Sequence, residues 1–298
     1  MQRRIDTPMV ALVFGIALMS VGPLRAEMTT AQLIDKVAGA ERLVTSGAGT
    51  TIVHEQRFGN TSLGAITLPD EVRTTYKWAF AGGDLRQEVR RTTPPYTKDG
   101  KLVVESLTGT QSQRYVPDDK QMMVFGAASR GRVSLHPLWA QYIDLAAALD
   151  NNFQFLSAEI TSASPTASGT GTVDGVDTVV LAGKSVLGQD VKWWIAPDYG
   201  YRVVKRETRW QLQDGGKETV VTDTYGAYAA VAEGVWLPSA VACTKTVGTP
   251  GGPHSVVLKI TATTSFESVN EPVDASKLLI VPTVGTEITY VDDVRAKS

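Results

Sequence analysis

The sequence predicts a mainly β protein (α+β) with one large curved antiparallel sheet. This sheet forms an open half-barrel, and an N-terminal helix and a central helix cover its concave side. Short β-rich segments separated by Gly- and Pro-containing turns run through most of the chain, which is typical of antiparallel sheets. Only two segments have helical spacing. About ten strands twist and curl strongly, and two helices are too few to cover such a sheet completely.

The first helix is predicted to begin at Thr29 or Thr30 and to end near Thr45. Threonine is a favourable N-cap residue, and glycine is the preferred residue after a helix, here Gly47. The apolar residues between these ends have helical spacing. They are Leu33, Val37, Ala40 and Val44.

Strands are predicted where β-branched and aromatic residues alternate with polar ones. The clearest case is 72–80, where alternation puts Tyr76, Trp78 and Phe80 on one face. Asp99-Gly100 predicts a hairpin turn after Tyr96. The strands expected are 50–58, 72–80, 85–91, 102–107, 113–116, 121–125, 176–182, 189–195, 201–212, 219–225, 235–246 and 255–266.

The central helix is predicted over 137–149. Pro137 suits the first helical turn, and Leu138, Tyr142, Leu145 and Leu149 follow at helical spacing. The Ser-, Thr-, Ala- and Gly-rich stretch 161–172 is expected to be an added loop. Because neither side of this stretch has enough helices to cover a sheet of its own, we expect a single domain over 27–298.

Residues 1–26 are predicted to be a secretory signal peptide. Arg3 and Arg4 precede an apolar run, 9–22, that is too short to span a bilayer, and Ala26 is a small residue at the expected cleavage site. An uncleaved membrane anchor is the alternative. The product is expected to be exported across the inner membrane and periplasmic.

Composition argues against several classes of function. The formal net charge is −2, so the chain lacks the basic excess that nucleic-acid binding requires. Three histidines and one cysteine leave little material for a zinc site, and Cys243 cannot form an intrachain disulfide. Adjacent aspartates such as Asp118-Asp119 are more typical of turns than of calcium sites.

No local motif indicates catalysis. The chain has no nucleophile elbow, no metalloprotease helix motif and no phosphate- or dinucleotide-binding loop. His54, His136 and His254 are far apart in sequence, and nothing near any of them predicts a base–nucleophile pair. We therefore expect no catalytic residue, no cofactor and no metal.

Four stretches resemble one protein family. They are the predicted helix 31–43 leading into strand 50–58; YKWAF at 76–80 followed by LRQEV at 85–89; YTKDGK at 96–101 ahead of YVPD at 115–118; and WWIAPDYGYRV at 193–203. In these the chain resembles the periplasmic lipoprotein-carrier superfamily, the LolA/LolB-like outer-membrane lipoprotein-sorting proteins and their relatives. The resemblance implies an open half-barrel whose apolar concave side holds acyl chains. Some members carry lipoproteins, and others sense envelope stress.

The predicted ligand site is an apolar pocket on the concave side. Ligand pockets are concave and rich in aromatic residues, and the lining expected here is Tyr76, Trp78, Phe80, Trp193, Trp210 and Trp236. The alternative is that these rings simply fill the core. The predicted lid consists of Leu138, Trp139, Tyr142 and Leu145 on the central helix. Arg90 and Arg91 are expected to form a headgroup rim, or else to be solvated on the convex face.

The function expected is that of an exported, non-enzymatic protein that binds a lipid acyl chain or a lipoprotein. It would act as a carrier or as an envelope lipid sensor, with a membrane-associated donor or acceptor protein as partner. The alternative is a structural or interaction module whose concave side is filled by its own side chains and which binds a protein at a sheet edge. A hydrolase whose site is assembled from distant residues is a third possibility.

Overall fold

The computed structural model describes residues 28–59, 62–63, 66–67, 70–81, 84–93, 96–98, 101–104, 107–116, 121–126, 130–134, 156–211, 216–279 and 287–290. Within them, fourteen strands form one large sheet. In spatial order they are β11 (Thr166–Val173), β12 (Val176–Lys184), β13 (Asp190–Ala196), β14 (Arg202–Gln211), β15 (Glu218–Ala232), β16 (Val235–Gly248), β17 (His254–Val269), β1 (Ser46–Arg57), β4 (Glu71–Ala81), β5 (Asp84–Thr93), β8 (Leu107–Val116), β9 (Gln121–Gly126), β10 (Arg130–Ser134) and β18 (Glu287–Tyr290).

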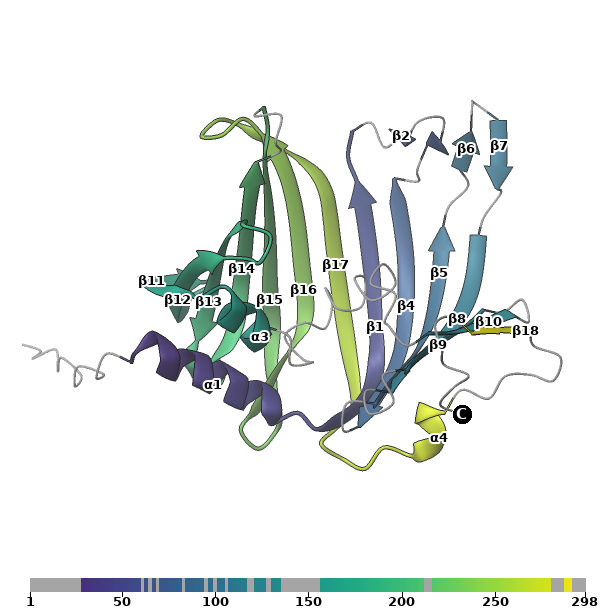
Figure 1. Cartoon of the computed structure of the whole chain (residues 1–298), viewed down its shortest axis with the longest axis horizontal. Helices are drawn as coiled ribbons and strands as arrows, with labels where there is room; N and C mark the ends of the chain where they lie inside the picture. The colour runs from purple at the N-terminus through teal and green to yellow at the C-terminus, as the bar shows by residue number, and fades with distance from the viewer. Residues whose placement is uncertain are drawn as a thin grey trace, which may run out of the picture.

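The predicted fold class is confirmed, because this sheet is open and carries helices on one side. Its edges are β11 and β18, which do not pair with each other in the described part of the chain. Figure 1 shows the long strands from β14 to β4 side by side, with helices α1 (Thr30–Arg42) and α3 (Leu156–Ser162) in front of the β11–β16 half. A short helix, α4 (Ala275–Leu278), follows β17, and a 3-10 turn, η1 (Pro197–Tyr199), follows β13.

The strand order shows that the large sheet consists of two meanders rather than one. β11 to β17 do form a meander, and β1, β4, β5, β8, β9 and β10 form a second one. Antiparallel pairing of β17 with β1 joins the two, for example Ala262 opposite Val53. These residues are about two hundred positions apart in sequence, so local pattern alone could not predict the pairing.

Two further details differ from the prediction. The expected strand 102–107 is divided: β7 (Lys101–Val104) pairs with β6 (Tyr96–Lys98) in a small second sheet with β2 (Ser62–Leu63) and β3 (Ile66–Thr67), whereas β8 begins at Leu107. The predicted hairpin is confirmed by the pairing of Lys98 with Lys101. One pair of strands, β10 and β18, is parallel, so the large sheet is not wholly antiparallel.

The predicted first helix is confirmed as α1. Thr29 accepts a hydrogen bond from the Gln32 amide at 3.2 Å, and the Gln32 side chain accepts one from the Thr29 amide at 2.9 Å. Such a capping box stabilises a helix start by about 1 kcal/mol. At the other end, the Asn270 side chain donates to the Leu43 carbonyl at 2.7 Å and accepts from the Thr45 amide at 2.9 Å. Asn270 thus links the end of β17 to the α1–β1 connection.

The helix predicted over 137–149 lies outside the described residues, and the central helix that the structure describes is α3. The stretch 161–172, expected to be a loop, supplies the end of α3 and most of edge strand β11. Nearly all side chains of β11 are exposed, so the strand has no apolar alternation to reveal it. Its structure comes from backbone pairing with β12.

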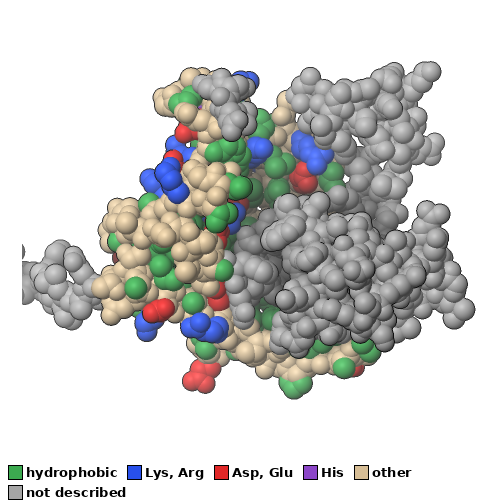
Figure 2. Space-filling view, viewed as in Figure 1, with side chains coloured by type: hydrophobic (Ala, Val, Ile, Leu, Met, Phe, Trp, Pro, Cys, Tyr) green, Lys and Arg blue, Asp and Glu red, His purple; other side chains and the backbone are tan. Residues whose placement is uncertain are grey.

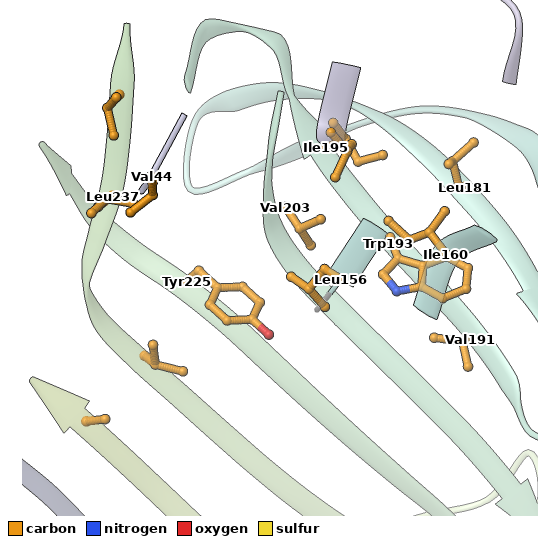
Figure 3. Packing of buried hydrophobic residues seen from close by; sticks show 14 of the residues in the cluster. Val44, Leu156, Ile160, Leu181, Val191, Trp193, Ile195, Val203, Tyr225 and Leu237 are labelled. Carbon is orange, nitrogen blue, oxygen red and sulfur yellow. The ribbon is translucent and has the colours of Figure 1, made fainter. Parts of the chain in front are cut away.

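The hydrophobic core lies between the two helices and the sheet. Leu33 and Val37 of α1 and Leu156 and Ile160 of α3 belong to one buried cluster with the inward-facing strand residues. Figure 3 shows Leu156 and Ile160 beside the strand residues Trp193, Leu181 and Val203. The concave face of the β11–β16 half is therefore closed by packed side chains near the helices.

Candidate functional site

Strand alternation and register define which residues share the concave face. One row crosses four strands close to the helices: Tyr225, Val241, Ala262 and Val53, all of them buried, as is Val203 on the neighbouring strand β14. Each belongs to the core cluster that includes α1 and α3. This row therefore marks the covered, apolar part of the concave face.

Three of the predicted pocket residues lie on the concave face of β4, and all three are buried: Tyr76, Trp78 and Phe80. The Trp78 side chain is only 4% exposed, and its indole nitrogen donates to the Thr51 hydroxyl at 3.0 Å. Glycine at 49 lies opposite Trp78 in the sheet. A Cβ there would lie 2.7 Å from the indole, so the ring occupies the space that a side chain would need.

Trp193, another predicted pocket residue, is fully buried under α3. Figure 3 shows its ring with Ile160, Leu181 and Val191 around it. Its indole N–H has no hydrogen-bond partner within the described residues, which is uncommon for a buried donor. Leaving such a donor unpaired costs about 1–3 kcal/mol.

Trp210 and Trp236 are half-buried and lie apart from the core cluster. Trp236 alternates with the core residues Val235 and Leu237, so it lies on the opposite face of β16, and its ring is 5.4 Å from that of Tyr199. Trp210 shares the concave face with Arg206, four positions earlier on β14. Among the six predicted residues, Trp210 therefore combines a concave position with partial exposure.

Further from the helices, the concave face carries apolar side chains that are only partly covered. These are Trp210 of β14, Val221 of β15, Cys243 of β16, and Leu258 and Ile260 of β17. We call this group the trough. Figure 2 shows hydrophobic, basic and acidic side chains exposed near one another in the upper middle of the view. Sequence reasoning missed Leu258 and Ile260, although their alternation with exposed Lys259 and Thr261 was a visible signal.

Charged side chains lie in the same part of the concave face. Arg206 contacts Asp223 on β15, Nε to Oδ2 at 3.0 Å, and Glu159 on α3, Nη1 to Oε2 at 3.0 Å. On β1, Arg57 forms an ion pair with Glu55. Because these three ion pairs are partly buried, solvent screens them less than it screens exposed pairs. The first network attaches α3 to the sheet.

Cys243 is unsuited to nucleophilic chemistry. Burial raises the pKa of its thiol strongly, and the neighbouring Asp223 carboxylate, with which it forms a hydrogen bond, raises the pKa further. The thiolate is the reactive form of cysteine. The side chain therefore acts as a small apolar residue of the trough.

A buried carboxylate joins the two helices. Glu41 of α1 accepts a hydrogen bond from the Ser157 amide at the start of α3 at 2.9 Å and a second from the Ser157 hydroxyl. Arg202 of β14 donates to the Ala40 carbonyl at 2.8 Å, and burial lowers the pKa of this guanidinium. The α1–α3 unit is thus fixed to the sheet by polar contacts as well as by the core.

Several predicted residues lie outside the described residues. The lid residues Leu138, Trp139, Tyr142 and Leu145 are outside the described residues, as are the signal segment 1–26, His136 and the aspartate pair at 118–119. The backbone positions of Arg90 and Arg91 are described, and these residues pair with Thr75 and Thr74 of β4.

The two described histidines are far from each other. His54 pairs with Thr261 of β17, seven residues beyond His254, which corresponds to about 23 Å along the strand. Their carboxylate neighbours also differ: Glu71 is 3.6 Å from His54, and Glu218 is 3.2 Å from His254. Within the described ranges, no group of three or more His, Cys, Asp or Glu side chains could hold a metal ion.

The fold and the trough define a half-barrel protein with a partly covered apolar concave face. In the portion of the chain that the structure describes, no helix has the length and apolar character needed to cross a membrane. No family model matches the sequence, and no curated protein matches it.

Solved structures similar to this chain include the following three. A DUF1329 family protein from Desulfovibrio piger is 12% identical, with a TM-score of 0.46, over 85% of this chain and 98% of that one. A putative outer membrane lipoprotein-sorting protein domain from Vibrio parahaemolyticus is 11% identical, with a TM-score of 0.43, over 82% and 95%. A LolA superfamily protein from Nitrosomonas europaea is 14% identical, with a TM-score of 0.40, over 85% and 98%. At such identities and TM-scores, function has to be argued from this chain's own residues.

Proposed function

We propose that the protein binds the acyl chain of a lipid or lipoprotein along the trough, as a non-enzymatic carrier or lipid sensor of the cell envelope. The observation that carries this proposal is the set of apolar side chains on four adjacent strands, all on the concave face and all incompletely covered. Small-molecule sites are typically concave and mostly apolar, with a few polar groups. The basic start and apolar run of residues 1–26 support export.

Burial of apolar surface alone can supply the affinity for an acyl chain. Each CH₂ group removed from water contributes about 0.8 kcal/mol, so ten of them contribute about 8 kcal/mol before the cost of association. Leu258 and Ile260 are neighbours on the same face of β17, about 7 Å apart. They lead from the partly covered trough to buried Ala262, so they form an apolar path toward the core.

The experiment begins with the protein purified after export and without detergent. Native mass spectrometry should detect a lipid-sized adduct that is lost on organic extraction. The extracted protein should then bind a 1-monoacylglycerol, and Leu258→Asn should weaken binding about tenfold, because two or so CH₂ contacts are lost.

Thr261→Asn is the matched control for Leu258→Asn. Thr261 lies on the same strand, but it is exposed on the opposite face. It should leave the affinity unchanged, and thermal unfolding should show that both variants are folded. Absence of any adduct together with absence of monoacylglycerol binding would overturn the proposal, as would equal effects of the two substitutions.

A second candidate is a protein-interaction module. It is favoured by the filled space under α1 and α3, where Trp193 is 0% exposed, and by the exposed edge strand β11. An open strand edge can pair with a strand of a partner. This candidate predicts that the protein remains free of lipid and that blocking the β11 edge, for example with Thr170→Pro, abolishes capture of a partner.

A further inference from the structure

Lys245, in the described part of the trough, is a cation without a carboxylate partner within 4 Å. Two rows of residues cross the trough, and four of their charged side chains are in ion pairs: Arg206 with Asp223, and Arg57 with Glu55. The fifth, Lys245 of β16, has no ion-pair partner within 4 Å among the described residues. It lies between Val221 of β15 and Leu258 of β17.

The surroundings of Lys245 are aromatic and aliphatic. Its ammonium lies 5.9 Å from the ring centroid of Trp210, within the range of a cation–π interaction. Its neighbours on the same face are Val221 and Leu258, and Cys243 is two positions earlier on the same strand. The side chain is half-buried, so part of the hydration of the ammonium is lost.

Arg57 provides a second positive charge on the other side of Leu258. Two strand spacings, about 10 Å, separate the backbone of Lys245 from that of Arg57. Long side chains at this separation can both reach a group placed above Leu258. Since Arg57 already has Glu55 as its partner, Lys245 is the cation available to an incoming anion.

We propose that Lys245 binds the anionic headgroup, a carboxylate or phosphate, of an acyl lipid whose chain lies along Leu258 and Ile260. This proposal rests on the proposed function and assigns the class of ligand to an anionic amphiphile. A half-buried ammonium gains more from a charged acceptor than an exposed one does, because solvent screens it less. Trp210 positions the Lys245 ammonium over the aliphatic side chains of Val221 and Leu258.

The test compares two lipids that differ by a phosphate. Lysophosphatidic acid and 1-monoacylglycerol with the same acyl chain are titrated into the full chain by calorimetry, below their micelle concentrations. Lysophosphatidic acid should bind at least tenfold more tightly. In Lys245→Met this preference should fall below threefold, with the affinity for monoacylglycerol unchanged, whereas Lys245→Arg should retain it.

Lys259→Met is the matched control. Lys259 also lies over an aromatic ring, 5.7 Å from the centroid of Phe58, but on the opposite face of the sheet. It should keep the full preference for lysophosphatidic acid. Thermal unfolding of each variant shows whether Lys245 only balances the cluster of Glu159, Arg206 and Asp223. In that case, Lys245→Met lowers stability, both lipids retain their affinity ratio, and the proposal is wrong.

The remaining outcomes separate this inference from the function on which it rests. If the wild-type protein binds both lipids equally, the headgroup assignment fails and acyl binding stands. If it binds neither, the acyl-binding function fails, and the inference fails with it. If glycerol 3-phosphate alone binds as tightly as lysophosphatidic acid, the site takes a free phosphate rather than a lipid headgroup, which also overturns the proposal.

Discussion

Replacing Gly49 with alanine should destabilise the protein by about 3 kcal/mol, at the upper end of the range for overpacking. A Cβ at this position would lie 2.5 Å from the Ser265 carbonyl oxygen and 2.7 Å from the Trp78 ring. Neither neighbour moves easily. The Ser265 backbone belongs to the β1–β17 ladder, and Trp78 is held by its hydrogen bond to Thr51 and by the ring of Phe266, whose centroid is 6.1 Å away.

The control is the same substitution at Gly39, in the interior of α1. A Cβ at Gly39 would meet nothing within 4 Å, so Gly39→Ala should gain helix propensity and stabilise the protein by about 0.8 kcal/mol. Urea unfolding should give both values with unchanged m. At about 2–4 °C per kcal/mol, Gly49→Ala should lower the Tm by roughly 6–12 °C. A loss below 0.5 kcal/mol, or equal losses at both positions, would refute the packing argument.

Two further predictions concern buried ionisable groups. Because the pKa of Cys243 is raised in the folded state, folding favours the protonated thiol, and stability should fall as pH rises above the unfolded pKa of about 8.5. The wild type should therefore lose about 1.4 kcal/mol more than Cys243→Ala between pH 7.5 and 9.5; parallel losses would show that the thiol is not shielded. Glu41→Ala should cost about 2 kcal/mol in urea unfolding, because the Ser157 amide loses its acceptor. An unchanged midpoint would show that water replaces the carboxylate.

The elements of the fold were largely predictable because they depend on local chemistry. The Thr29 cap and the spacing of Leu33 and Val37 indicated α1, and the alternation in 72–80 indicated β4 with Tyr76, Trp78 and Phe80 on one face. β11 could not be predicted in this way, because an exposed edge strand of small residues has no apolar period.

The candidate site was less predictable than the fold. Aromatic residues were expected to line a pocket, yet Trp78 and Trp193 are buried in the core. Half-buried Trp210 belongs to the trough, together with Leu258 and Ile260, which were not predicted as site residues. The residue type at a position shows that its side chain is aromatic and apolar. It does not show whether a helix covers that side chain, as α3 covers Trp193.

The sequence by itself determined the fold class, the shared face of Tyr76, Trp78 and Phe80 and the start of α1, because the periods of 2 and 3.6 and the N-cap residue act over a few positions. It did not determine the end of α1, because the helix stops at Arg42 and Gly47 lies in β1. Only the tertiary structure decided that β17 pairs with β1, and therefore that Leu258 lies between Lys245 and Arg57. The physical reason is that register between distant strands depends on the packing of whole faces. The position of Lys245 beside Leu258 in the trough is a consequence of that register.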